Sequence, residues 1–431
     1  MITQLGSLHP EALSVIGRAS VMRYKKKDAP IDQIGRELNV DYVLEGSAQR
    51  EANRVRITAK LIRVNDQTQI WARPYEHELS GIMVVQSELA KSVAEALALR
   101  LLPAEKDRLA SARTVNPEAY EAYLKGSSLW KTLKSADLDA AQRRFEQALV
   151  RDPSYAPAYE GLTWVWLIRQ QTDVATPHEA GPKAKAAVLQ ALVLDGNSAG
   201  AHEALATVRM ACDWDWAGAE PEWKRALELN PNSANAQAYY AHFLAILGRA
   251  DEALLHSELA IKLDPFNALY HGMYAMVLDY LRRWDDALAA ARTALSYQPD
   301  LGIAIDMFQR VYINKGMRNE QLAEQRLRVA RDPERLAAFE RGLAEGGYEG
   351  AQRAIADVYA ARYATGKYRD AMGVAFRYLD GGDKDRAMDW LLKAYEAHDP
   401  SLLYVGRPHW DRLRGDPRFQ ALLRRMGLPQ K

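Results

Sequence analysis

The sequence predicts an α+β region at its amino-terminal end, followed by an all-α array of stacked helical hairpins. Two observations predict this fold class. Apolar and polar residues alternate with a two-residue period only within the first hundred positions, and this period is typical of half-buried strands. After them, short motifs that end in proline return every 34 residues, which is the spacing of a repeated two-helix unit.

Residues 1–102 contain the signals for strands. In the segment 54–64, Val55, Ile57 and Leu61 alternate with charged residues, so one face of a strand enters a core and the other meets water. Pro30 precedes an apolar stripe at helical spacing and suits a first helical turn. The elements expected in order are a short strand-like run at 13–20, a helix at 30–39, strands at 41–50, 54–64 and 69–76, and a helix at 81–102.

The helical part repeats with a constant step. The motifs ALELNP, AIKLDP, ALSYQP and RVARDP end at Pro231, Pro265, Pro299 and Pro333. Proline stops a helix because it cannot donate to the helical ladder. One hairpin cannot bury its apolar face alone, so neighbouring units must stack into a superhelix. The equivalent positions upstream are Pro153 and Gly196, and their wider spacing predicts an insertion near 176–182.

This register resembles the tetratricopeptide (TPR) family. The units within 234–299 have alanines where two helices cross, among them Ala241, Ala253 and Ala275. The unit that ends at Pro333 keeps the period but has Gln309 and other large polar residues at such positions, so we expect a degenerate repeat, and a further hairpin includes 383–397. The resemblance implies a superhelical solenoid whose first helices line a concave face.

The first region is similar to the TolB-like amino-terminal domain. The similarity is carried by VIGRASVMRYK (15–25), IGRELNVDYVLEGSAQ (34–49) and RVRITAKLIRVNDQTQIWARPYEHEL (54–79). In bacteria this domain often precedes TPR arrays, in proteins that begin with a CadC-type DNA-binding domain, a nucleotide cyclase or a kinase. The ending DPRFQALLRRMGLP (416–429) is similar to the tails of such proteins. The family's domain opens with an apolar strand that precedes the first residues here, so the resemblance implies a small mixed sheet that lacks its first strand.

The expected division is an α+β domain at 1–102, a linker at 103–117, a TPR array at 118–400 with about six to eight hairpins, and a C-terminal capping segment at 401–431. The unpaired edge of the incomplete sheet would allow another chain to dock, so a homo-oligomer through this sheet is one expectation.

Composition excludes several classes of protein. The 431 residues include 57 Lys and Arg against 56 Asp and Glu, and this balance disfavours direct binding of nucleic acid by general electrostatic attraction. The single cysteine, Cys212, excludes a disulfide framework and a cysteine-ligated metal centre. The sequence contains no stretch of about 18 apolar residues, so it predicts no membrane span. We therefore expect a cytoplasmic chain, or a periplasmic one if a membrane anchor lies upstream.

No catalytic pattern is present. The sequence lacks a glycine-rich phosphate loop, GxSxG and HExxH, and its nine histidines are scattered. We therefore expect no enzyme activity and no catalytic, cofactor-binding or metal-binding residues. The motif Asp213–Trp216 has the residue types of a sugar site, but its tryptophans fall at a turn and at a bulky repeat position, which favours packing.

The predicted function is that of a non-enzymatic protein–protein interaction module, which serves as an adaptor or sensory arm in bacterial signalling and binds a partner in the concave groove. The alternative is the C-terminal sensory portion of a transcriptional regulator or adenylate cyclase whose effector domain lies outside this sequence. Each candidate contact has an alternative role, in which its side chain only faces water in the groove and binds no partner. The candidate contacts are Tyr123, Trp130, Lys134, Asn235, His242, Met276, Asp279, Tyr280, Asp306, Arg310 and Asn314.

Overall fold

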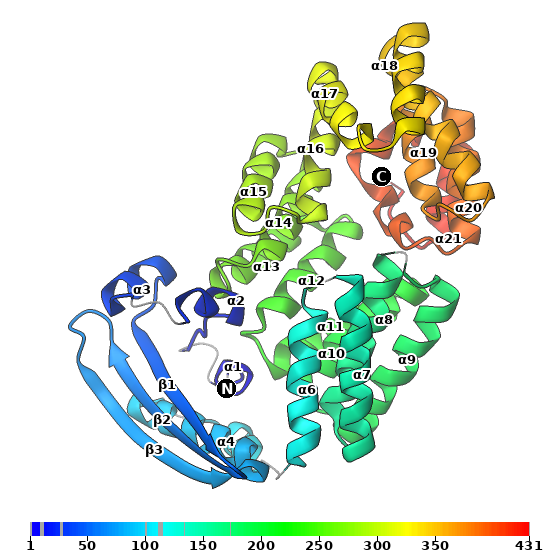
Figure 1. Ribbon diagram of the computed structural model, residues 1–431. Coiled ribbons are helices and arrows are strands. Elements are labelled where there is room, and N and C mark those ends of the chain that lie inside the picture. Colours follow the sequence, from blue (N-terminus) through cyan, green and yellow to red (C-terminus); the bar gives the residue numbers. More distant parts are fainter. Residues whose placement is uncertain are drawn as a thin grey trace.

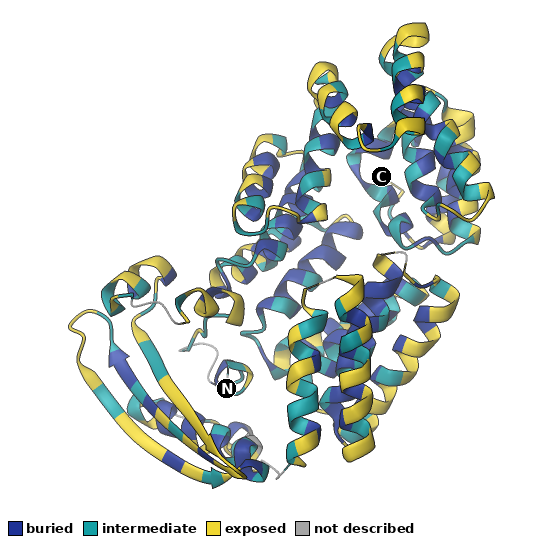
Figure 2. Ribbon diagram, in the orientation of Figure 1, coloured by how far each residue is buried: buried dark blue, intermediate teal, exposed yellow. Residues whose placement is uncertain are grey.

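A computed structural model describes residues 2–8, 13–25, 29–99, 101–110, 115–132, 134–172 and 174–430. A small sheet domain lies beside a curved array of helices, and the C-terminal residues return to the inside of that curve (Figure 1). Buried residues concentrate where helices stack, whereas strand β1 and the outermost helices are exposed (Figure 2).

The sheet has three strands in the order β1-β2-β3, namely Tyr42–Glu51, Arg54–Arg63 and Gln69–Glu78. All pairs are antiparallel, so the expectation of a mixed sheet is wrong. The physical reason is that short turns join consecutive strands and reverse the chain each time. The predicted alternation in β2 is confirmed, since Val55 and Leu61 are buried while Arg54 and Arg56 are exposed.

Helix α4 covers one face of the sheet and buries Val85, Leu89 and Val93 in the same core as Ala59 and Tyr75. The predicted helix at 30–39 is present as α3. The expected linker contains α5, and residues 111–114 of that linker lie outside the described residues. The helices of this region are α1 (Ile2–Gly6), α2 (Arg18–Val21), η1 (Met22–Tyr24), α3 (Ile31–Leu38), η2 (Leu79–Gly81), α4 (Ile82–Ala96) and α5 (Pro103–Ala110).

The strand-like run expected at 13–20 is wrong, because residues 18–21 form helix α2. The cause lies far away in the sequence. The buried carboxylate of Asp264 accepts hydrogen bonds from the backbone nitrogen of Ser20 (2.8 Å) and from its hydroxyl (2.5 Å). A carboxylate at the first N–H groups of a helix stabilises that helix. The Gly17 N–H also donates to the carbonyl of Leu263 (2.6 Å), so this contact joins the sheet domain to the array.

The array consists of consecutive helix pairs that stack side by side, and the described hairpins agree with the predicted 34-residue register. Ala241, Ala253, Ala275 and Ala287 are almost completely buried, as expected where helices cross closely. The pairs are α6 (Pro117–Trp130) with α7 (Ser135–Arg151), α8 (Ala156–Gln171) with α9 (Pro177–Leu194), α10 (Ala199–Val208) with α11 (Trp216–Leu229), α12 (Ala234–Ile246) with α13 (Ala250–Leu263), α14 (Ala268–Tyr280) with α15 (Trp284–Tyr297), α16 (Gly302–Asn314) with α17 (Arg318–Val329), and α19 (Ala371–Asp380) with α20 (Lys384–Glu396).

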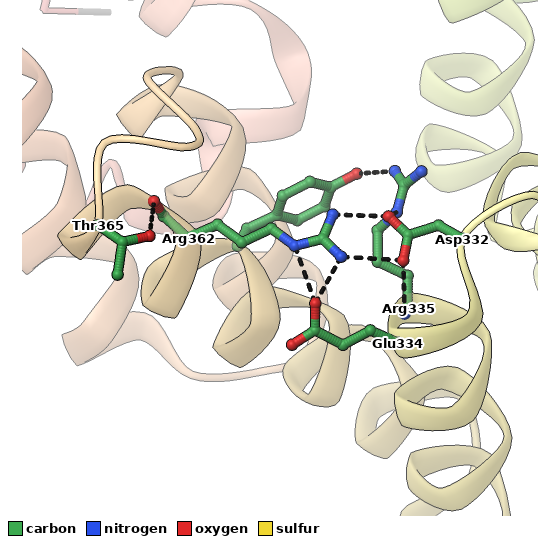
Figure 3. A network of polar contacts seen from close by, with 6 residues as sticks. Asp332, Glu334, Arg335, Arg362 and Thr365 are labelled. Carbon is green, nitrogen blue, oxygen red and sulfur yellow. Dashed lines mark hydrogen bonds and ion pairs between the residues drawn. The ribbon is translucent and has the colours of Figure 1, made fainter.

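Between α17 and α19, α18 (Pro333–Ala364) is a hairpin in its own right. Its backbone leaves the helical conformation at Gly346 and Gly347, and Gly347 has a φ of 57°, which favours glycine. An ion-pair network closes the open end of this hairpin (Figure 3). The guanidinium of Arg362 lies 2.6 Å from Asp332 and 2.5 Å from Glu334, so the start and the end of α18 are held together.

The Asp264 contact makes a testable prediction. Asp264→Ala removes a buried acceptor from several donors, so we expect the free energy of unfolding to fall by about 2 kcal/mol or more. Hydrogen exchange at residues 17–21 should rise together with that loss. Urea denaturation and hydrogen exchange followed by mass spectrometry measure the two effects.

The matched control is Asp152→Ala, at the equivalent repeat position. The Asp152 carboxylate accepts from Ser154 within its own loop. Equal exchange at residues 17–21 in both variants and the unchanged protein would contradict a docking role for Asp264.

Candidate functional site

The concave side of the array is occupied by a segment of the same chain. We call residues 400–413 the tail; it consists of η4 (Pro400–Gly406) and η5 (Pro408–Leu413). The first of these helices contacts α8 and α12, and the second contacts α16. The tail residues Leu402, Val405 and Leu413 are buried. The tail is therefore part of the hydrophobic core and lies against the first helices of the hairpins.

A buried ion pair holds the tail in place. The guanidinium of Arg407 donates to the carboxylate of Asp279 through Nε (3.0 Å), and its Nη2 lies 2.8 Å from the same oxygen. The two side chains are only 4% and 1% exposed. Asn314 donates to the other carboxylate oxygen at 3.1 Å. Removing one partner from such a pair would leave an uncompensated buried charge, which is strongly destabilising.

Aromatic rings surround this ion pair. The ring of His242 stacks on that of Tyr404 with centroids 5.4 Å apart, and Arg407 lies 5.9 Å from the ring of Tyr280. Burial lowers the pKa of His242 to about 4, and the charge of Arg407 acts in the same direction. His242 is therefore neutral at physiological pH.

The structure brings six of the predicted contact residues together near the tail. These are His242, Met276, Asp279, Tyr280, Arg310 and Asn314. The tail already covers the part of the groove that they form, so their role in binding a partner stays a prediction. A partner at these six residues would have to displace the tail.

The other five predicted residues do not join this group. Tyr123 packs against Phe145 and Tyr155, Trp130 stacks on Trp164 (5.6 Å), Asn235 hydrogen-bonds Glu203 and Tyr270, Asp306 forms an ion pair with Arg328 (2.8 Å), and Lys134 is exposed at the start of α7. Aromatic packing and neighbouring polar groups thus engage four of the five.

Two carboxylates that sequence reasoning missed lie on the first helices. The Glu160 side chain accepts from the hydroxyl of Ser198 (2.5 Å), the residue that caps α10, and Glu203 contacts Asn235 in α12. Burial raises the pKa of both carboxyls to about 7. The repeat register could have identified this pair, because each glutamate follows its repeat-ending residue, Pro153 or Gly196, by seven positions.

The packing interpretation of Asp213–Trp216 is confirmed. Trp214 stacks on His398 with ring centroids 3.8 Å apart, and the indole N–H of Trp216 donates to the carbonyl of Met426 (2.6 Å). Both tryptophans therefore attach the C-terminal end to the third hairpin of the array. Burial raises the pKa of the neighbouring Cys212 thiol to about 12, so this cysteine is protonated and poorly nucleophilic at neutral pH.

Among the described residues, no three His, Cys, Asp or Glu side chains are grouped as a metal site would require. In the same part of the chain, no helix has the length and apolar character needed to cross a membrane.

Comparison with known proteins gives matches to parts of the chain. No protein-family model matches it. The putative adenylate cyclase 3 of Rhizobium meliloti (strain 1021) is 34% identical over 216 residues, which are 50% of this chain. The matched region is 36% of that relative, so the chain spans about a third of its length.

Solved structures provide a comparison of the fold. Human IFIT1, solved as a dimer with m7Gppp-AAAA, matches 72% of this chain and 77% of its own, with a TM-score of 0.50 and 15% identity. The thermophilic TPR protein TTC0263 of Thermus thermophilus matches 45% of this chain and 98% of its own, with a TM-score of 0.37 and 20% identity. TPR proteins are therefore among the structural neighbours of the array.

The raised pKa of the buried Glu203 carboxyl predicts a pH dependence of stability. A carboxyl whose pKa is raised in the folded state binds its proton more tightly there, so its stabilising contribution is full below the unfolded pKa and is lost as pH rises through about 7. Glu203→Gln removes this dependence. We expect the variant to lose less free energy of unfolding than the unchanged protein between pH 5 and pH 8, measured by urea denaturation.

Glu228→Gln, at an exposed position on α11, is the matched control and should leave the pH profile unchanged. If Glu203→Gln and Glu228→Gln give the same profile as the unchanged protein, the buried carboxyl does not titrate as described.

Proposed function

We propose that this chain is a non-enzymatic protein–protein interaction module that serves as an adaptor or sensory arm in bacterial signalling. The observation that carries the proposal is the curved array of hairpins, in which neighbouring first helices contact each other from α6 to α10 and again from α12 to α16 (Figure 1). Stacked repeats of this kind offer extended binding surfaces. The partner would be a peptide or a protein segment, and the compartment that fits this proposal best is the cytoplasm.

Within the described ranges, the proposed contacts are candidate residues that the tail does not contact. Lys134 and Asp306 are exposed, and Trp130 and Asn235 are half-buried. A segment bound there would meet both charges and aromatic surface. Contacts through the residues under the tail belong to a second step, in which the tail leaves the groove.

The sheet domain, which we propose to be TolB-like, would be the second element of the module. Its contact with the array through Asp264 would transmit a change in one part to the other. Residues 46–51 of the edge strand β1 are exposed, whereas the opposite edge strand, β3, contains Pro74, which has no N–H to donate. A homo-oligomer would therefore form along β1.

Selection from a random peptide library on the full chain tests the interaction function. We expect enriched peptides to bind the unchanged protein and to lose about tenfold in affinity, measured by fluorescence anisotropy, when Lys134 is changed to Glu, because the charge of a proposed contact residue is reversed. Lys262→Glu, at another exposed lysine on α13, is the control. A library without enriched peptides, or equal loss in both variants, would contradict the proposal.

A second candidate function is that of the regulatory portion of a longer signalling protein, either a nucleotide cyclase or a transcriptional regulator. It is supported by the partial match to a relative whose name is putative adenylate cyclase 3. The intact mass of the protein isolated from its source cell discriminates the two candidates. A mass larger than that of the 431-residue chain by at least the mass of a domain of about 100 residues supports the second candidate function. A mass equal to that of the 431-residue chain supports the first candidate function.

A further inference from the structure

Five side chains converge where the tail meets the concave face. We call them the central cluster: His242 of α12, Tyr280 of α14 and Arg310 of α16, together with Tyr404 and Arg407 of the tail. Arg407 lies 5.9 Å from the ring of Tyr280 and 6.0 Å from that of Tyr404, on which His242 stacks. Arg310 lies 5.3 Å from the ring of Phe376, on which His409 of the tail stacks. Burial and, after it, the charge of Arg407 lower the pKa of Arg310.

Arg310 has no anionic partner of its own. In the part of the chain that the structure describes, its guanidinium makes no hydrogen bond or ion pair, and its contact is the ring of Phe376 at 5.3 Å. A guanidinium stays charged in proteins, so the half-buried side chain of Arg310 presents a positive charge that no acceptor among the described residues neutralises. Burial lowers the pKa of Arg310 to about 10, which still leaves it charged at neutral pH.

The carboxylates near Arg310 have other partners. Asp279 is bound by Arg407 and Asn314, and Asp306 lies 2.8 Å from Arg328. Asp370 accepts from the backbone nitrogen of Gly373 (2.6 Å) and from Tyr368 (3.1 Å). The surroundings of Arg310 therefore supply cations and donors, but no carboxylate that is free to pair with it.

Unsatisfied polar groups lie in the same cluster. His242 is 5% exposed, and neither of its ring nitrogens has a hydrogen-bond partner among the described residues. The hydroxyl of Tyr280 is also buried without a partner there. Such groups are rare in native proteins and indicate a ligand or bound water. A neutral histidine donates one N–H and the tyrosine donates its O–H, so both complement an anion.

A cavity lies beside two neighbours of the central cluster, although none of the five cluster side chains lines it. It has a volume of about 300 Å³, and its lining includes Asn314, which binds Asp279, and His409. His409 stacks at 4.0 Å on Phe376, the same ring that Arg310 contacts. The cavity has room for a small molecule next to these two neighbours, and the cover of the tail excludes a polymer from the cluster itself.

We propose that the central cluster binds a small oxyanion, a carboxylate or a phosphate, with the guanidinium of Arg310 as its main ligand and the His242 and Tyr280 side chains as further donors. The planar fork of an arginine matches both kinds of group. Because Tyr404 and Arg407 belong to the tail, a bound oxyanion would also hold the tail against the groove. Its concentration would then control how readily the groove opens.

Thermal unfolding and isothermal titration calorimetry on the full chain test this proposal. Sodium phosphate and sodium succinate are the two probes, at an ionic strength kept constant with sodium chloride. We expect saturable binding of at least one probe with a Kd below about 1 mM and a melting temperature that rises with its concentration. Binding of phosphate alone identifies a phosphoryl ligand, and binding of succinate alone identifies a carboxylate ligand.

Arg310→Met should weaken this binding by about tenfold or more. Without probe, its melting temperature should equal or exceed that of the unchanged protein, because the substitution removes the repulsion between the half-buried charge of Arg310 and that of Arg407. Arg292→Met is the matched control, since the exposed Arg292 also lies over an aromatic ring, that of Phe308 at 5.8 Å. Arg310→Lys keeps the charge without the planar fork and should bind with intermediate affinity.

Two results would overturn the proposal. One is the absence of saturable binding of both probes to the unchanged protein. The other is equal affinity in the unchanged protein and in folded Arg310→Met or Arg310→Lys.

Discussion

The buried ion pair between Arg407 and Asp279 is the interaction on which the closed form of this molecule depends. Two charges removed from water are tolerated only when each neutralises the other and further hydrogen bonds complete the arrangement. Asn314 supplies one of these bonds, and the rings of Tyr280 and Tyr404 flank the guanidinium. The contacts of Arg407 and Tyr404 require the tail to lie in the groove, whereas the bond between Asn314 and Asp279 lies within the array. The same hydrophobic core then extends continuously from the second hairpin to the C-terminal helix α21 (Pro417–Arg425).

This arrangement changes how the concave face would work. An open TPR-like groove binds a partner directly, whereas here a partner at the middle of the groove competes with a segment that is already attached to the chain. A covalently attached competitor has a high effective concentration, so it is displaced only by a strongly binding partner or after a change that weakens its own contacts.

The sequence allowed prediction of features that arise from local patterns. Proline at each 34-residue step and alanine at the helix crossings identify the hairpins. Proline ends a helix and alanine allows close packing, and both effects act within one repeat unit. Strand β2 was predicted from its alternation for the same reason. Features that depend on distant contacts were missed. Helix α2 is helical because Asp264, some 244 residues away, binds its first turn.

The same distinction separates the predicted from the unexpected parts of the candidate site. The repeat register located His242, Asp279 and Arg310 on the first helices. It contained no information about the tail, in which Arg407 was one of several arginines in an expected capping segment. The functional consequence of a residue in the groove depends on what covers it, and this cover comes from a part of the chain that has no repeat register.

Hydrogen exchange of residues 401–413 in the full chain, followed by mass spectrometry under native conditions, tests the central claim most directly. The account predicts that the amides of the tail that form helical hydrogen bonds exchange as slowly as those of the core helices α12 and α14, because without a partner to displace it the tail stays in the groove. Exchange of the tail at the rate of an unstructured peptide, while α12 and α14 stay protected, would contradict it.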